Sequence, residues 1–499
     1  MNETKYDILI KSCTVVDGTG SPGYKADVAV KSGKIAAIQP GLPEDSASSV
    51  IDAGGKLVCP GFIDAHCHTD WAILDGPWDD HQERQGVTTQ IGGLCGTSPV
   101  SIREHLEQAH KQGLGTNYAL FAGHGSIRYE VMGDENRKPT SEELDQMKAL
   151  LKTAMDEGAL GLSTGLIYKP GVFSDTEELI EMAKVIAPMG GIYATHMRSE
   201  SDDIEKALDE AITVARTAGT PLQISHIKVI MPRNWGFATK MLDRIRQEQS
   251  RGLKITADQY PYAVTGGGHY GAARLVEGYD RETGFDMFEE QYQDIEKRNE
   301  MAEYASALIA ERGGPEYFSI IKASQDKFIG MYLHDALAQQ ASLNLGEFIV
   351  HEIHESKGQF AMVYHSVSEE ELAQFMQQPW VMGGTDGVPG AFHPRTHGTF
   401  PRILGRYVRE KQVLSLEEAI RKITSLPADT LGLEGRGRLT PGAMADIVVF
   451  DPDTVIDRSN MVQPTLYPDG IDHVLINGVP VIEKGERTGA FPGKVLLRK

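Results

Sequence analysis

Short apolar runs recur along the middle of the chain, and each ends in a polar or glycine-rich cluster. Successive ends lie about 30 to 40 residues apart until the last, which suits a strand followed by its crossover helix. The segments between them, such as 141–155, 174–184 and 202–212, carry apolar residues at helical spacing. We therefore predict an α/β fold, a (β/α)8 (TIM) barrel, whose functional side chains stand at the C-terminal strand ends. The predicted ends lie near His66, Cys95, His124, Thr164, His196, His226, Asp258 and Asp386.

The interval between the last two predicted strands exceeds one strand–helix unit by about 90 residues. The extra segment, about 266–378, opens with a glycine-rich stretch and continues with charged, helix-favouring sequence such as 300–312. Insertions on this face of a barrel commonly form lids and specificity loops. We predict a partly helical insertion between strands 7 and 8 that covers the site.

Both ends of the chain read as short strands separated by turns, over 6–60 and again over 444–485. Neither end has enough strands for a stable sheet alone, so the two ends are expected to pair. The predicted organisation is one small β-sandwich domain made from residues 1–60 and 426–499. Residues 61–425 form the catalytic barrel with its insertion.

Charge and composition narrow the class of partner. The net charge is −21 and no basic cluster is visible, which argues against nucleic acid or an anionic membrane surface. No apolar run is long enough to span a bilayer, and the N-terminus lacks a signal-peptide pattern. The four cysteines do not form a disulfide-dense pattern, which suits a reducing compartment. We expect a cytoplasmic protein whose oligomeric state the sequence leaves unknown.

Residue types that bind zinc stand at the predicted strand ends. In a strand, alternate side chains share a face, so His66 and His68 point together while Cys67 points into packing. Imidazoles, a lone thiolate and a late carboxylate make a ligand set suited to zinc, and they indicate a metallohydrolase. The candidate metal ligands are His66, His68, Cys95, His196 and His226, with Asp386 as the carboxylate.

Each of these residues also has a plainer interpretation. Cys95 alone reads as a small buried hydrophobe, the histidines as satisfied core residues, and Asp386 as a turn aspartate before Gly387. Their shared location at the ends of barrel strands favours the ligand interpretation.

Several motifs resemble the amidohydrolase superfamily, above all Pro60-Gly-Phe-Ile-Asp-Ala-His-Cys-His68 and Ala445-Asp-Ile-Val-Val-Phe-Asp451. Others narrow the resemblance to the D-aminoacylase (N-acyl-D-amino-acid deacylase) family, and it runs from about Tyr6 to Leu497. The cysteine on the second strand is its most specific mark, since most of the superfamily bridges its metals with a carboxylated lysine or a glutamate. These narrower motifs are 86–89, 93–99, 161–168, 195–200 and 393–402.

This resemblance implies a role for each candidate. Cys95, His196 and His226 would hold one tightly bound zinc ion (Zn²⁺), and His66 with His68 would form a second, weaker position. Asp386 would be the general base. The α-carboxylate of the substrate would bind the remaining candidates: Lys228, Tyr260 or Tyr262, and Arg395.

The spacing and side-chain chemistry of these residues give a second argument about the substrate contacts. Lys228 lies two positions beyond His226, so on a continuing strand it faces the same side. The planar guanidinium of Arg395 suits bidentate binding of a carboxylate. For Tyr168, at another strand end, packing and substrate contact both stay open. Arg274 in the insertion would favour acidic substrates, and an exposed loop arginine is the equal alternative.

The leading hypothesis is a zinc-dependent hydrolase that cleaves the N-acyl amide bond of N-acyl-D-amino acids, small molecules with a free carboxylate. One alternative is a dipeptidase acting on dipeptides with a C-terminal D-residue. A cyclic amidohydrolase of hydantoinase or dihydroorotase type is a second, which Cys95 argues against because that class uses a carboxylated lysine. The third is an inactive amidohydrolase-fold structural protein, which would be expected to have lost ligands. The preference for D over L comes from the resemblance alone.

Overall fold

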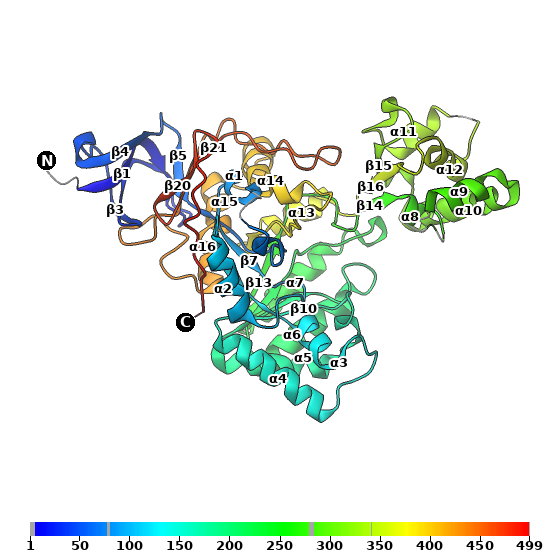
Figure 1. Cartoon of the computed structure of the whole chain (residues 1–499), viewed down its shortest axis with the longest axis horizontal. Helices are drawn as coiled ribbons and strands as arrows, with labels where there is room; N and C mark the ends of the chain where they lie inside the picture. Colours follow the sequence, from blue (N-terminus) through cyan, green and yellow to red (C-terminus); the bar gives the residue numbers. More distant parts are fainter. Residues whose placement is uncertain (1–4, 77–79, 278, 280–283, 341, 499) are drawn as a thin grey trace.

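The computed structural model describes residues 5–76, 80–277, 279, 284–340 and 342–498. Figure 1 shows three parts: a strand-rich part that joins the two chain ends, a central barrel with its helices, and a lobe formed by the insertion. No helix in these ranges combines the length and apolar content needed to cross a bilayer.

The barrel strands follow one another in chain order around the ring, and every pairing between them is parallel. β9 continues the line of β8 after Phe121, and a parallel bridge between Cys67 and Gly387 joins the last strand to the first. Each of the eight predicted strand ends lies within three residues of an observed end, so the predicted barrel is confirmed. Its strands are β6 (Phe62–Asp64), β7 (Val87–Gly92), β8 (Asn117–Leu120), β9 (Ala122–Gly123), β10 (Gly161–Gly165), β11 (Ile192–His196), β12 (Leu222–Ile224), β13 (Ile255–Gln259) and β17 (Val381–Gly383).

Helices between these strands pack their apolar faces on the barrel. α4 begins after Thr140, whose side chain accepts from the backbone of Glu143 while the Glu143 side chain accepts in return. The segment 141–155, predicted to be helical, therefore begins directly after this cap. The barrel helices are α1 (His81–Arg84), α2 (Ile102–Gln112), α3 (His124–Met132), α4 (Ser141–Asp156), α5 (Thr176–Ile186), α6 (Ile204–Ala218), α7 (Ala238–Ser250), α13 (Glu369–Met376), α14 (Arg395–Arg402), α15 (Leu416–Ile423) and α16 (Ser425–Leu431).

Strands from both chain ends form one nine-stranded sheet, joined where β5 pairs antiparallel with β18. In this sheet β5 and β1 lie between β18 and β2, yet Val449 on β18 and Val28 on β2 belong to one apolar core. The sheet therefore curls around its own apolar residues. The small β-sandwich domain predicted from the two ends is thus present. Its strands are β1 (Tyr6–Val15), β2 (Tyr24–Lys31), β3 (Lys34–Gln39), β4 (Ala47–Asp52), β5 (Leu57–Pro60), β18 (Ile447–Phe450), β19 (Ile471–Ile476), β20 (Val479–Glu483) and β21 (Glu486–Arg487).

The C-terminal tail leaves this sheet and runs along the barrel. The backbone of Tyr118 on β8 donates to the carbonyl of Lys494 at 2.9 Å, and that of Leu496 donates to Tyr118 at 2.8 Å. The sequence predicts the β-sandwich over the whole of 426–499, but this tail lies against the barrel instead.

The insertion has a three-stranded sheet and an apolar core of its own, separate from that of the barrel. Phe318, Phe328, Phe348 and Phe360 are fully buried there. α13, which the sequence pattern placed at the end of the insertion, instead packs in the barrel core through Phe375. The elements of the insertion are β14 (His269–Gly271), α8 (Ala272–Leu275), α9 (Gly284–Gln293), α10 (Ile295–Glu311), β15 (Phe318–Lys322), α11 (Leu333–Ala338), α12 (Leu345–Glu355) and β16 (Ala361–Tyr364).

Candidate metal centre

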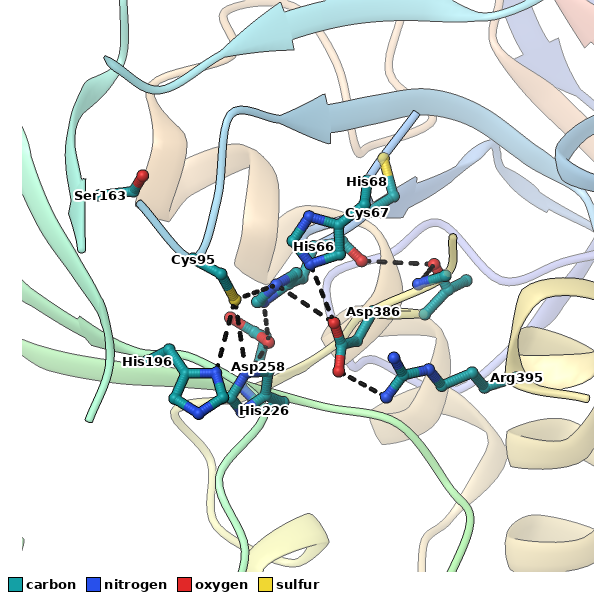
Figure 2. Close-up of polar contacts among 12 residues, drawn as sticks. His66, Cys67, His68, Cys95, Ser163, His196, His226, Asp258, Asp386 and Arg395 are labelled. Carbon is teal, nitrogen blue, oxygen red and sulfur yellow. Dashed lines mark hydrogen bonds and ion pairs between the residues drawn. The ribbon is translucent and has the colours of Figure 1, made fainter. Parts of the chain in front are cut away.

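The predicted metal ligands meet at the C-terminal ends of the barrel strands (Figure 2). His66 and His68 follow β6, Cys95 follows β7, and His196 ends β11. His226 follows β12 in the same way. All of them are buried except His68, which is partly exposed.

The Cys95 thiol lies among three imidazole nitrogens. Its Sγ is 3.4 Å from His66 Nε2, 3.7 Å from His196 Nδ1 and 3.5 Å from His226 Nε2. In a tetrahedral zinc site with ordinary Zn–S and Zn–N bonds, a sulfur and a nitrogen ligand are separated by about 3.5 Å. The donor atoms therefore fit zinc in both chemistry and spacing.

A second group of donors shares the same thiol. His66, His68, Cys95 and Asp386 offer ligand atoms that all lie within 4.8 Å of one another, and so do Cys95, His196 and His226. Asp386 Oδ1 is 3.1 Å from His68 Nε2. Cys95 therefore lies between two candidate metal positions.

Three of these residues adopt a left-handed backbone conformation, with φ of 51° at Cys95, 36° at His226 and 47° at Asp386. Such a conformation costs about 1–3 kcal/mol for a residue other than glycine, and it persists where the surrounding structure enforces it. Each of the three lies two or three residues beyond the end of its barrel strand. The backbone is therefore strained at the donors themselves.

Burial raises the pKa of the Cys95 thiol, but the imidazoles of His66 and His226 lower it by more than burial raises it. The pKa of this thiol therefore lies well below that of a free thiol. The site therefore favours the thiolate, which is the metal-binding form. Cys67 points away, with its sulfur 3.4 Å from the Ile91 carbonyl oxygen, as the strand alternation predicted.

Asp258, at the end of β13, orients two of the histidines. Its Oδ1 accepts from His66 Nδ1 at 2.8 Å and from the His226 backbone at 2.7 Å, and its Oδ2 accepts from Gln223 at 2.8 Å. With Nδ1 held in this way, His66 presents Nε2 to Cys95. The sequence pattern located Asp258 at a strand end but gave it no role. A carboxylate at a strand end, beside strands that end in histidines, is the sequence signal that could have indicated this orienting role.

Glu200 does the same for His226 on the other side. Its Oε1 lies 2.9 Å from His226 Nδ1 and 2.5 Å from Lys228 Nζ. Burial raises the pKa of Glu200, but Lys228, His226 and His196 together lower it below its ordinary value. Sequence reasoning missed this residue, although it closes the 195–200 motif.

Asp386 pairs with Arg395, whose Nη1 donates to Asp386 Oδ2 at 2.5 Å. Burial raises the pKa of Asp386, but Arg395 and the neighbouring imidazoles bring it well below its ordinary value, so the carboxyl is ionised. The Tyr260 ring lies 4.7 Å from the Arg395 guanidinium and 5.6 Å from Lys228 Nζ. Its buried hydroxyl has no hydrogen-bond partner in the described part of the chain.

These residues open into a cavity of about 730 Å³ between the barrel and the insertion. Lys228 lines it although β12 ends at Ile224, so the side chain turns inward from a loop rather than from a continuing strand. The barrel residues that line the cavity are His68, Ile167, Tyr168, His196, Glu200, His226, Lys228, Ile230, Met231, Tyr260, Asp386, Val388, Ala391, Phe392, His393 and Arg395.

Tyr262 does not line this cavity, whereas Tyr260 does, so of the two tyrosines expected as contacts of the α-carboxylate only Tyr260 is in place. The Tyr262 hydroxyl donates to Asp457 at 3.0 Å, and Arg402 lies over its ring. The two side chains face different ways because β13 ends at Gln259, before either tyrosine, so strand geometry does not hold them on one face.

Comparison with known proteins places the chain among deacylases. The model of the Amidohydrolase family matches residues 49–310 and 348–482. The N-acyl-D-glutamate deacylase of Alcaligenes xylosoxydans xylosoxydans is 33% identical over 99% of this chain and 97% of its own length. The D-aminoacylase of the same organism is also 33% identical, over 99% and 98%. The crystal structure of N-acyl-D-glutamate deacylase from Bordetella bronchiseptica, complexed with zinc and a phosphonate inhibitor, has a TM-score of 0.79 at 32% identity and covers 99% of this chain and 100% of that one.

Proposed function

Because the chain belongs to the amidohydrolase family, and within it to the D-aminoacylase family, we propose that it hydrolyses N-acyl-D-amino acids to a carboxylate and the free D-amino acid. The observation that carries the proposal is the Cys95 thiol, set among the histidines and beside the ionised Asp386. The substrate is a small molecule that enters the cavity above these residues.

Cys95, His196 and His226 would hold the tightly bound zinc, and His66 with His68 the weaker position. Zinc, when bound, polarises the scissile carbonyl and lowers the pKa of a water molecule to about 7. Asp258 and Glu200 keep the imidazole donors pointing at the thiol, because each accepts from the opposite ring nitrogen.

Asp386 is the proton carrier of the reaction. It is ionised, buried and within 3.1 Å of His68 at the edge of the donor cluster. Its carboxylate accepts the proton of the attacking water and then delivers it to the departing amide nitrogen.

Lys228, Tyr260 and Arg395 bind the substrate α-carboxylate. All three line the cavity, and the unpartnered Tyr260 hydroxyl can donate to an anion there. Arg395 supplies a planar pair of donors that matches a carboxylate. Tyr168, about half exposed at the rim with its ring 5.1 Å from that of His196, contacts the substrate near the scissile bond.

The alternatives receive less support. A cyclic amidohydrolase would use a carboxylated lysine to bridge its metals, whereas Cys95 belongs to both donor groups here and Lys228 in the cavity pairs with Glu200. An inactive structural protein would not need the full donor set. A dipeptidase acting on a C-terminal D-residue presents the same amide and α-carboxylate, so only substrate tests separate it. The cytoplasmic location expected from the sequence stays a proposal.

The test is amine release by zinc-loaded protein from matched N-acetyl-D- and N-acetyl-L-amino acids and from D-terminal dipeptides. Ring opening of hydantoin and dihydroorotate, which forms an N-carbamoyl amino acid and frees no amine, is followed alongside by loss of the cyclic amide. Turnover of the N-acetyl-D-amino acids alone is the expected result. Preferred cleavage of the dipeptides would reassign the enzyme as a dipeptidase. Turnover of the cyclic amides, or of none of these compounds, would overturn the proposal.

A further inference from the structure

The hydroxyl of Ser163, in the middle of β10, contacts the loop that carries Cys95 (Figure 2). Ser163 is fully buried and does not line the cavity, so it does not reach a substrate there. We propose that Ser163 is a positioning residue, which directs the Cys95 thiolate toward the imidazoles and thereby raises the affinity for zinc. The inference rests on the proposed function, from which it takes the zinc donors.

Cys95 occupies the first central position of a tight turn. The backbone of Thr97 donates to the Leu94 carbonyl at 3.2 Å and closes this turn. Both central residues have a positive φ, 51° at Cys95 and 77° at Gly96, as in a type I′ turn. Asn, Asp and Gly usually occupy such positions, because the Cβ of a larger residue crowds its own backbone. A cysteine is therefore strained there, and the turn depends on contacts from outside.

One hydroxyl holds this turn on both sides of the cysteine. Ser163 Oγ donates to the Gly93 carbonyl at 2.5 Å and accepts from the Gly96 backbone at 3.1 Å. The two contacts bracket Cys95 along the chain. A single atom that both donates and accepts is a hydroxyl, which alanine lacks. Alanine at position 163 would therefore release both backbone groups at once.

The wall behind the turn leaves it little room to shift. A Cβ added at Gly165, two residues beyond Ser163, would lie 2.0 Å from the Cys95 carbonyl oxygen. A Cβ added at Gly93 would lie 2.1 Å from the Phe121 carbonyl oxygen. The two glycines therefore let the turn approach the neighbouring strands closely enough for the Ser163 hydroxyl to reach it.

A serine is unusual at this place in a barrel. Leu162 belongs to the core between the barrel and its helices, so by strand alternation Ser163 faces the barrel interior. Bulky apolar side chains ordinarily fill that interior, and Leu94 of the turn packs there with Ile91. In the part of the chain that the structure describes, both hydrogen-bond partners of the Ser163 hydroxyl belong to the loop of Cys95. The hydroxyl thus serves that loop.

A comparable contact holds a second strained donor. Asp258 accepts from the His226 backbone at 2.7 Å, and His226 also has a positive φ. In both cases a buried polar side chain of another strand holds the backbone beside a donor in its left-handed conformation. Donors held in this way need less ordering when a metal binds, which strengthens binding.

The experiment measures zinc affinity by competition between the metal-free protein and a chelator of known affinity. Ser163→Ala should weaken zinc binding by about 10- to 100-fold, the usual effect of removing a residue that orients a metal ligand. Ser163→Thr, which keeps a hydroxyl, should restore part of the loss.

Ser225→Ala is the matched control. Ser225 is also buried and adjoins the donor His226, but its hydroxyl has no hydrogen-bond partner among the described residues. The same substitution there should keep the zinc affinity of the unaltered protein.

A second measurement separates direction of the thiolate from general damage to the fold. In a Cys95→Ala background no thiolate remains, so Ser163→Ala should change the residual zinc affinity much less than it does in the unaltered protein. In the cobalt-substituted proteins, the thiolate-to-metal charge-transfer band should shift or weaken in Ser163→Ala and stay unchanged in Ser225→Ala.

Equal zinc affinity in the unaltered protein and in Ser163→Ala would overturn the proposal. An equal loss in both backgrounds would also overturn it, because a merely structural role acts without the thiolate. If Ser163→Ala does not fold, Ser163→Cys takes its place in both comparisons, since a thiol of similar size donates and accepts only weakly.

These measurements need no turnover, so the two proposals can fail separately. Protein that binds zinc as expected but hydrolyses no N-acyl-D-amino acid would reject the proposed function and keep the role of Ser163. Unaltered protein that binds no zinc would reject the metal site and the positioning role together.

Discussion

At the residue scale, Cys95 combines three properties that make it the centre of the site. Its sulfur faces three imidazoles, its backbone is in the left-handed region, and it belongs to both groups of metal donors. Cys67, the neighbour of His68 in the chain, is also buried but faces packing. The two cysteines therefore allow a matched comparison.

Cys95→Ser should reduce bound zinc to well below one equivalent, because a neutral hydroxyl replaces the thiolate. Cys67→Ser should keep the zinc content. Elemental analysis of the dialysed proteins measures both, and unchanged zinc in the Cys95 variant would remove this residue from the ligand set.

Asp386→Asn should lower kcat by about 10²- to 10⁴-fold, the usual contribution of a general base, since an amide cannot accept the proton. Zinc should remain, because Cys95, His196 and His226 are untouched. Turnover and zinc content are measured on the same preparation. A variant that keeps both would show that another group carries the proton.

At the element scale, the insertion is built as a unit beside the barrel. Its aromatic core is separate from that of the barrel, and its strands and loops carry Arg274, Arg312 and Tyr364 to the cavity. Helical patterning predicted a helix over 300–312, and the structure has α10 there, beginning earlier at Ile295. The pattern did not place the end of the insertion, because helical spacing over 369–376 does not show that α13 packs in the barrel core through Phe375.

Phe348→Ala should destabilise the insertion by about 3–5 kcal/mol, since the ring is fully buried between Phe328 and Phe360. Hydrogen exchange should accelerate in α10 and α12 while the barrel strands stay protected. Tyr304→Ala, at a partly exposed site on α10, is the control. Faster exchange in the barrel as well would mean that the two cores unfold together.

At the scale of the whole molecule, a buried polar network links the terminal sheet to the barrel. Asp446 accepts from the Asn477 backbone at 2.7 Å and from Asn117 on β8 at 3.3 Å, and it also pairs with Arg436. This explains why the aspartate stands in the otherwise apolar 445–450 run. Two segments more than 300 residues apart are thereby connected.

Asp446→Ala should therefore cost about 3–5 kcal/mol of stability, because it leaves the buried Arg436 guanidinium without its partner. Asp429→Ala, which removes a partly exposed partner of Arg438, should cost at most about 1 kcal/mol. Denaturant unfolding of the two variants provides the comparison. Equal losses would show that the network is not needed to hold the sheet on the barrel.

The sequence by itself determined the barrel, its eight approximate strand ends and the zinc-type donors at them. Strand and helix periodicity and side-chain chemistry are properties of neighbouring residues, so they can be recognised without the tertiary structure. The sequence also determined that both chain ends supply strands. Only the tertiary structure decided that Tyr260 lines the cavity while Tyr262 does not, and that Glu200 and Asp258 orient histidines. It alone brought Arg312 to the cavity wall. These outcomes depend on contacts between segments distant in the chain, and on where each strand stops, which no local period encodes.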